Sequence, residues 1–200
     1  MRHWWLRTLL VLTAPRAVFV ALRNDDPEDA AERAEPVLLI VWLAGIAFVL
    51  ATRTTSHLMD QADAPQGIAL AVWAFLAGGL FGGVAYWFLG GVLHRVGVAL
   101  GSQGSYRRAR HVLAFAAVPV ALSLVLWPFK LALYGDDVFR RGGADAGSGG
   151  HVFEVILVAF LVWSAALLLV GVRSVHGWTW PRAAAAAALP IVLAAAFVLV

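Results

Sequence analysis

The sequence predicts an all-α integral membrane protein: a bundle of five transmembrane helices with a short N-terminal interfacial helix. Two observations carry this prediction. Hydrophobic residues make up 62% of the 200-residue chain and charged residues only 14%, whereas soluble domains contain about 25% charged residues. The apolar residues also form long runs, and a helix needs roughly 20 of them to cross a bilayer. We therefore expect lipid to surround most of the chain.

The first region, residues 1–35, is predicted to be a cytosolic interfacial helix followed by an acidic connector. Thr13 and Pro15 are typical of a helix start, as an N-cap and a first-turn proline, and they predict a short helix over residues 15–22. Arginines mixed with apolar residues are typical of a helix that lies at the membrane surface. A signal peptide and a sixth span are the alternatives. The acidic residues of 24–35 predict a solvated connector.

The remaining region, residues 36–200, is predicted to form the five-span transmembrane domain. The first span is the shortest, and we expect Pro36 to open its helix and Arg53 to reach the interface at its end. Prolines in or near later spans predict kinks, at Pro119, Pro128 and Pro190. The predicted spans are residues 36–53, 67–93, 111–133, 152–172 and 182–200.

The positions of arginine and lysine predict the orientation of the chain. With a cytoplasmic N-terminus, eleven of the 15 basic residues lie on the cytoplasmic side and four on the other, as the positive-inside rule favours. The C-terminus then lies outside. A single lysine accompanies fourteen arginines and abundant alanine and glycine, a bias typical of GC-rich bacterial genes. We therefore expect a multi-pass protein of a bacterial plasma membrane.

A stripe of small residues runs along the second predicted span. Its glycines recur at spacings of three and four residues, which places them on one face of a helix, and they include Gly78, Gly79, Gly82 and Gly83. Because lipid provides no hydrophobic drive between helices, such a stripe lets two backbones approach and gain van der Waals contact. The stripe predicts helix packing, either within the bundle or between two copies of the chain.

The residue types that carry most enzyme and metal chemistry are missing or scattered. Cysteine is absent, and no two of the six histidines have the i, i+4 spacing of a helical metal site. The sequence therefore predicts no enzyme, no catalytic, cofactor-binding or metal-ligating residue, and no nucleic-acid binding. Lys130 and Glu154 are ionisable residues near the outer ends of their spans, and they predict an ion pair across the short outer loop. The same pair motivates the alternative function, a transporter or permease subunit.

One segment is more specific than its composition. The residues GSQGSYRRARHVLAFAAVPVALSL place Gly101, Gly104, Ser105 and Tyr106 before a basic stretch and put Pro119 in the helix that follows. This pattern resembles the cytosolic loop and third span of the Yip-domain family of multi-pass membrane proteins. The upstream TAPRAVFVAL is similar to the short N-terminal helix of bacterial members.

The resemblance implies a five-span bundle with a cytosolic N-terminus, in which these five residues form a structural turn and kink. Eukaryotic relatives act in vesicle trafficking with Rab-type GTPases, whereas bacterial members have no assigned biochemical activity. We therefore predict a non-enzymatic protein that organises the membrane or acts as a scaffold. Its expected partners are the lipid bilayer and other membrane proteins, or a second copy of itself. Contact with anionic lipid, or topology alone, is predicted for Arg107, Arg108 and Arg110.

Overall fold

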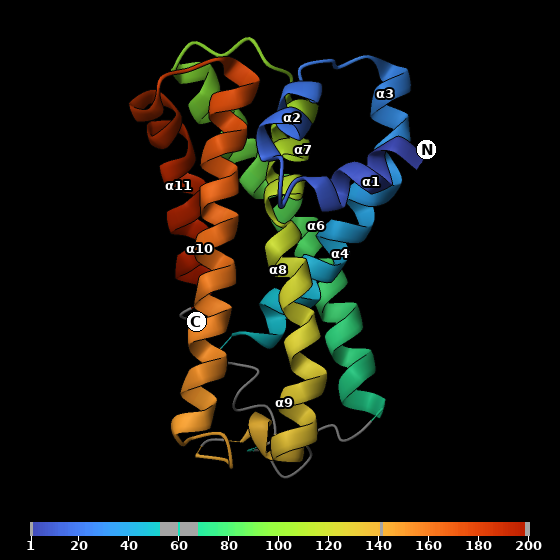
Figure 1. The fold of residues 1–200 in the computed structure, drawn as a ribbon, viewed down its shortest axis with the longest axis vertical. Coiled ribbons are helices and arrows are strands. Elements are labelled where there is room, and N and C mark those ends of the chain that lie inside the picture. Colours follow the sequence, from blue (N-terminus) through green and yellow to red (C-terminus); the bar gives the residue numbers. More distant parts are fainter. Residues whose placement is uncertain (1, 53–59, 61–67, 141, 199–200) are drawn as a thin grey trace.

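The computed structural model describes residues 2–52, 60, 68–140 and 142–198, which form a bundle of helices with no strand among them (Figure 1). Five helical segments in this part of the chain are long and apolar enough to cross a membrane. The predicted all-α bundle with a short N-terminal helix is thus confirmed. The segments are Pro27–Leu50, Ala71–Ala99, Tyr106–Phe139, Ser148–His176 and Trp180–Phe197.

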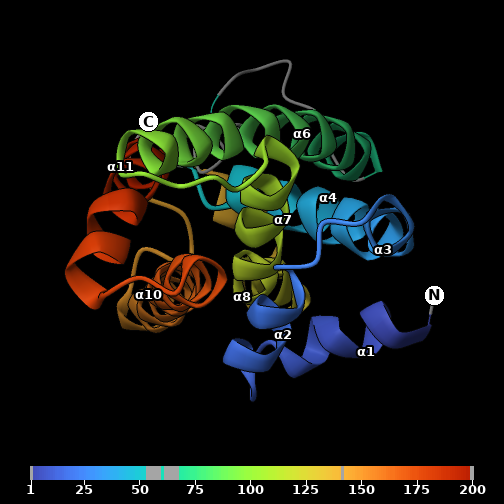
Figure 2. The ribbon, with the colours of Figure 1, turned by 90° about the horizontal axis from the view of Figure 1, so that it is seen from above.

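The third span is broken into shorter helices, whereas the other spans rest on one long helix each. The long helices are α4 (Ala34–Leu50), α6 (Ile68–Ala99), α10 (Ser148–His176) and α11 (Trp180–Val198). The third span contains α7 (Tyr106–Ala116), α8 (Val118–Leu122), the 3-10 turn η2 (Ser123–Val125), α9 (Leu126–Tyr134) and the 3-10 turn η3 (Gly135–Phe139). α4 packs against α6 and the third span, α10 packs against α7, α8 and α11, and α11 packs against α6 (Figure 2).

Two helices extend past the apolar runs that predict them. α6 continues from the predicted end at residue 93 to Ala99 and takes in His94 and Arg95. α10 spans Ser148–His176, where residues 152–172 are predicted. Long polar side chains let a helix continue into the headgroup region, because their charged ends reach water while the backbone stays hydrogen-bonded. Arg53, the residue expected to end the first span, lies outside the described residues.

Two helices, α1 (Arg2–Leu10) and α2 (Pro15–Ala21), precede the first span, where the sequence predicts a single helix over residues 15–22. The prediction of Thr13 as N-cap is wrong. Ala14 holds that position, and the Thr13 hydroxyl donates to the carbonyl oxygen of Leu10 at 3.4 Å because the chain turns directly after α1. Both helices lie on the side of the bundle away from α6 (Figure 2).

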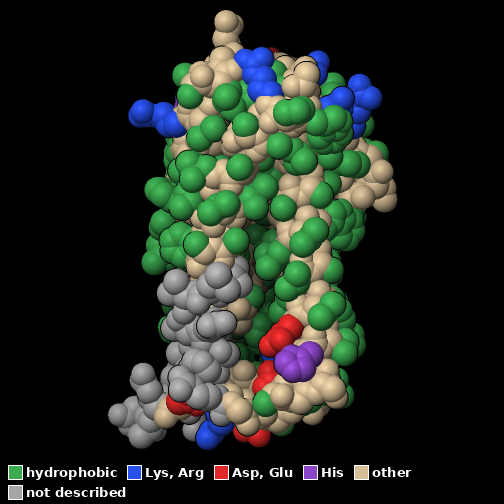
Figure 3. Space-filling model, turned by 90° about the vertical axis from the view of Figure 1, so that its left-hand side faces the viewer, with side chains coloured by type: hydrophobic (Ala, Val, Ile, Leu, Met, Phe, Trp, Pro, Cys, Tyr) green, Lys and Arg blue, Asp and Glu red, His purple; other side chains and the backbone are tan. Residues whose placement is uncertain are grey.

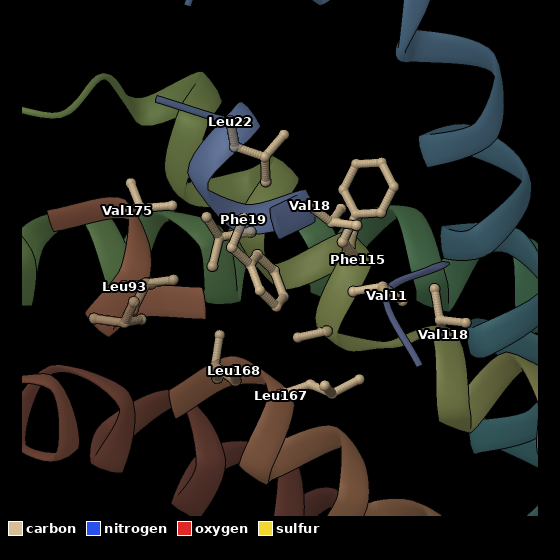
Figure 4. Close-up of a cluster of buried hydrophobic side chains, with 14 of the residues drawn as sticks. Val11, Val18, Phe19, Leu22, Leu93, Phe115, Val118, Leu167, Leu168 and Val175 are labelled. Carbon is tan, nitrogen blue, oxygen red and sulfur yellow. The ribbon is translucent and has the colours of Figure 1, made fainter. Parts of the chain in front are cut away.

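The helix α2 forms part of the main hydrophobic core. Its residues Val18 and Phe19 are buried together with Phe115 of α7 and with Leu167 and Leu168 of α10 (Figure 4). Because Leu167 and Leu168 belong to a membrane-spanning helix, this packing stabilises through van der Waals contact. The N-terminal segment therefore packs into the hydrophobic core as well as lying at one end of the bundle.

The acidic connector over residues 24–35 is partly helical, and most of its residues are exposed. Asp26 caps α3 (Pro27–Glu32) by accepting a hydrogen bond from the backbone N–H of Glu28 at 3.4 Å, and Pro27 occupies the first turn. Arg33, which follows α3, has no solvent exposure. Helix-start residues thus order this segment, and the buried Arg33 packs its end against the bundle.

The contact between α4 and α6 depends on glycines from both helices. A Cβ atom on Gly45 of α4 would overlap the backbone of Gly78 and Gly82, and one on Gly79 would overlap the indole ring of Trp42. Gly83 differs from these, because its Cβ position has open space within 4 Å. Three of the four predicted packing glycines therefore face the inside of this bundle, and the fourth faces outward.

Pro119, where the sequence predicts a kink, lies in the first turn of α8, directly after the break between α7 and α8. α7 ends at Ala116, and the hydroxyl of Ser164 on α10 donates to the Ala116 carbonyl oxygen at 2.7 Å. Side-chain hydroxyls from neighbouring helices commonly satisfy backbone groups that proline frees inside a membrane. Pro128 lies in α9 just after the 3-10 turn η2, and Pro190 lies within α11 without ending it.

Candidate functional site

Arginines of the described residues gather at one end of the bundle, which we call the basic end. It contains the N-terminal segment, the turn between α6 and α7, and the turn between α10 and α11 (Figures 1 and 3). The predicted turn residues and the predicted lipid-contacting arginines all lie here. The geometry of this end therefore tests what those residues do.

The turn between α6 and α7 is held by its two glycines and by Ser102. Gly101 has a positive φ of 84°, which glycine adopts without strain. The hydroxyl of Ser102 accepts a hydrogen bond from the backbone N–H of Gly104 at 2.9 Å and lies 3.3 Å from Nδ1 of His176. A Cβ on Gly104 would lie 3.1 Å from that imidazole ring. The glycine at each position is thus explained by backbone conformation or by the close approach of α10.

Ser105 and Tyr106 join this turn to the helices on either side. The hydroxyl of Ser105 accepts a hydrogen bond from the backbone N–H of Arg108 at 3.0 Å and so caps α7. The hydroxyl of Tyr106 donates to the carbonyl oxygen of Trp87 on α6 at 2.7 Å. These contacts fix the start of α7 against α6.

The carboxylate of Asp25 connects the N-terminal segment to the start of α7. Oδ1 of Asp25 lies 3.0 Å from Nε of Arg107 and 3.3 Å from a terminal nitrogen of Arg33, and Oδ2 accepts a hydrogen bond from the Ser105 hydroxyl. A terminal nitrogen of Arg107 also donates to the backbone carbonyl of Asp25 at 2.5 Å. We call this group, Asp25, Arg33, Ser105 and Arg107, the Asp25 junction.

The charge state of Asp25 follows from these partners. Burial by itself raises the pKa of the carboxyl group, whereas the hydrogen bonds from Ser105 and Arg107 and the charges of Arg107 and Arg108 lower it. The lowering effects prevail, so the pKa lies below its ordinary value of 3.8. Asp25 is therefore ionised at neutral pH and binds its cationic neighbours.

Several other arginines at this end bind backbone carbonyl groups and aromatic rings. Arg108 donates to the carbonyl oxygen of Arg23 at 2.8 Å, and Arg23 in turn donates twice to the carbonyl oxygen of Ser174, at 3.0 and 2.6 Å. The guanidinium of Arg110 lies 3.6 Å from the ring centroid of Trp87 and is also close to the rings of Tyr86 and Tyr106 (5.1 and 4.8 Å). The arginines predicted to contact lipid therefore have partners within the chain.

The opposite end of the bundle corrects the predicted pair of Lys130 and Glu154. Nζ of Lys130 lies 2.7 Å from Oδ2 of Asp145, whereas Glu154 lies 3.1 Å from Nδ1 of His151. The loop between η3 and α10 folds back over Lys130, and the side chains of Lys130 and Asp145 are largely buried. Glu154, by contrast, faces outward on α10 with 70% of its side chain exposed.

Sequence reasoning missed Arg23, Asp25 and Arg33 as members of the site. The acidic run around Asp25 was expected to be solvated, although the predicted topology places it on the same side of the membrane as the arginine-rich turn. The sequence signal that could have identified these residues is that the topology confines opposite charges to one side of the membrane. Within the part of the chain that the structure describes, no three His, Cys, Asp or Glu side chains form a group that could hold a metal ion.

Comparison with protein families gives one match, to the family model described as the Yip1 domain, over residues 9–200. No curated protein and no solved structure matches the chain at a significant level. The match covers the last two residues of α1, the Asp25 junction and all five spans.

Proposed function

Because this chain belongs to the Yip1-domain family, we propose that it is a non-enzymatic scaffold that binds a transmembrane helix of a partner protein on the outer face of α4 and α6. Five apolar helices make it a multi-pass membrane protein, so such a partner would meet it within the bilayer. The alternative of a transporter loses its motivating pair, because Lys130 and Glu154 each have a different partner.

The observation that supports this proposal is a shallow groove beside Gly83. A side chain is missing at Gly83 itself, and the residues around it are large and exposed, with Leu80 at 72% and Trp87 at 55%. Trp42, Val84 and Phe88 also line the groove. Small residues flanked by large ones let a second helix approach closely and gain van der Waals contact, which is the main attraction between helices in lipid.

The proposed orientation puts the basic end on the cytoplasmic side of the plasma membrane. In support, Arg23, Arg107 and Arg182 lie at this end together with the N-terminal segment, whereas Lys130 and Arg140 lie at the other. The chain contains no cysteine, so single cysteines at the exposed positions Gln103 and Ala146 can be labelled separately. An impermeant maleimide should label Gln103→Cys only after the membrane is opened and Ala146→Cys in intact cells. The reverse pattern would overturn the orientation.

A photocrosslinking amino acid at Leu80 tests the partner directly in native membranes. We expect a discrete protein adduct from this position and none from Val162 on α10, whose exposure of 63% is similar to the 72% of Leu80. Replacement Gly83→Ile should abolish the adduct, because its side chain would fill the groove while its Cβ meets no neighbour in the bundle.

Thermal unfolding of Gly83→Ile provides the control for folding, and its transition should match that of the wild-type protein. The same adducts from Leu80 and Val162, or an adduct that survives Gly83→Ile, would refute the proposal. An adduct with a mass of two chains would identify the partner as a second copy.

A further inference from the structure

A central cavity of about 250 Å³ lies between the helices, at mid-height of the bundle. Its walls come from all five spans, including Phe48 of α4, Phe81 of α6, Val120 of α8, Ala165 of α10 and Ala194 of α11. It shares Val84 and Phe88 with the groove on the outer face of α4 and α6, and its other lining residues are different. Figure 3 faces the side formed by α10 and α11 and shows a hollow between these two helices.

The walls of the cavity are almost entirely apolar. Among the described residues that line it, only Tyr86 and Ser164 carry polar side-chain atoms. The Ser164 hydroxyl already donates to the carbonyl oxygen of Ala116 at 2.7 Å. A buried water usually needs two to four polar partners, and apolar cavities that lack them stay dry and take up apolar ligands. The cavity is therefore suited to a hydrocarbon and not to water.

The shape and position of the cavity identify which hydrocarbon can enter. The opening between α10 and α11 lies within two membrane-spanning segments, so it faces the acyl chains of the bilayer. A helix with a diameter of about 10 Å would use up 250 Å³ in about 3 Å of its length. The volume exceeds the ~150 Å³ that accepts a benzene molecule in an engineered cavity. A single flexible chain fits where a helix does not.

We propose that this cavity binds one acyl chain of a membrane lipid, which enters sideways between α10 and α11. Three stacked or edge-on rings line it, with Phe48 and Phe81 at 5.1 Å and Phe81 and Phe197 at 5.8 Å between ring centroids. These rings give the chain a rigid apolar wall. The bound chain supplies the van der Waals contacts that an empty cavity of this size would lack.

Photolabelling of the purified full-length protein in vesicles tests this site. The vesicles contain phosphatidylcholine that carries a diazirine midway along one acyl chain, and labelled residues are located by mass spectrometry. We expect labelling at Ala165 and Val120 inside the cavity as well as at lipid-facing residues such as Val162. Replacement Ala194→Trp should reduce the inner labelling several-fold, because the indole occupies the cavity, and should leave Val162 unchanged.

The matched control is Val192→Trp, which adds the same side chain on the outer face of α11, where Val192 is 61% exposed. This variant should label like the wild-type protein. If Ala194→Trp fails to fold, Ala165→Leu fills the same cavity with a smaller change and should reduce labelling at Val120. Absence of inner labelling in the wild type, or inner labelling that persists in a folded filled variant, would overturn the proposal. Both outcomes are independent of the partner adduct at Leu80.

Discussion

Replacement Asp25→Ala should release the N-terminal segment from the bundle. The substitution removes the carboxylate that joins Arg33, Ser105 and Arg107 in the Asp25 junction. Loss of one partner from a fully buried ion pair costs about 3–5 kcal/mol, and loss of a more exposed charge-assisted hydrogen bond costs about 1.5–3 kcal/mol. The Arg33 side chain is fully buried, whereas those of Asp25 and Arg107 are 14% and 37% exposed. We therefore expect a cost of about 2–3 kcal/mol, in the upper part of the range for the more exposed case, because only Arg33 is fully buried.

Hydrogen exchange of the backbone amides measures this cost where it arises. Exchange in α2 and α3 should accelerate roughly 30- to 150-fold in Asp25→Ala, since each 1.4 kcal/mol is a factor of ten. The N-terminal half of α10, at the other end of the bundle from the Asp25 junction, should keep its protection from exchange. Glu28→Gln is the matched control, because Glu28 is exposed on α3 in the same segment. Equal exchange in the two variants would refute the assignment of the Asp25 junction as the anchor of the N-terminal helices.

Three further predictions follow from single contacts. Because the pKa of Asp25 is lowered in the folded protein, the stabilisation that this carboxylate provides is complete above pH 3.8 and is lost as the pH falls through the lowered pKa. Hydrogen exchange in α2, corrected for the intrinsic exchange rates, should show this loss. In Asp25→Ala the pH dependence should be absent. Gly45→Leu should destabilise the protein by about 1–3 kcal/mol in thermal unfolding because it forces α4 away from α6, whereas Gly83→Leu should have no effect. Lys130→Met should cost about 1–2 kcal/mol because it leaves the largely buried carboxylate of Asp145 unpaired. Glu154→Gln, by contrast, should change the free energy of unfolding by less than about 0.5 kcal/mol. A larger effect of Glu154→Gln than of Lys130→Met would contradict these two assignments.

The spans could be predicted from sequence because lipid imposes a simple length rule on apolar runs. The turn before α7 was also predictable, since Gly101 and Ser105 have local reasons to be glycine and serine: a positive φ and a helix cap. The family resemblance drew on the same residues, and the family match over residues 9–200 confirms it.

The partners of charged residues could not be predicted, because they depend on how loops fold back. Lys130 binds Asp145 through the return of the loop before α10, and no sequence spacing reveals that path. Asp25 meets Arg107 across 82 positions of the chain. The burial of Phe19 likewise depends on the close approach of α2 to Gly171, which is a property of the assembled core.

The arginines of the basic end have a consequence for helix electrostatics. Three of the carbonyl groups that they bind lie at helix C-termini: Arg182 donates to Leu100 after α6, Arg23 to Ser174 in the last turn of α10, and Arg108 to Arg23 after α2. Each C-terminus is the negative end of a helix macrodipole and has carbonyls without an intrahelical donor. Three such negative ends are thus neutralised by cations from other segments. An arginine-to-lysine exchange would keep the charge that orients a membrane protein but lose the paired donors with which Arg23 and Arg182 close two of these helices.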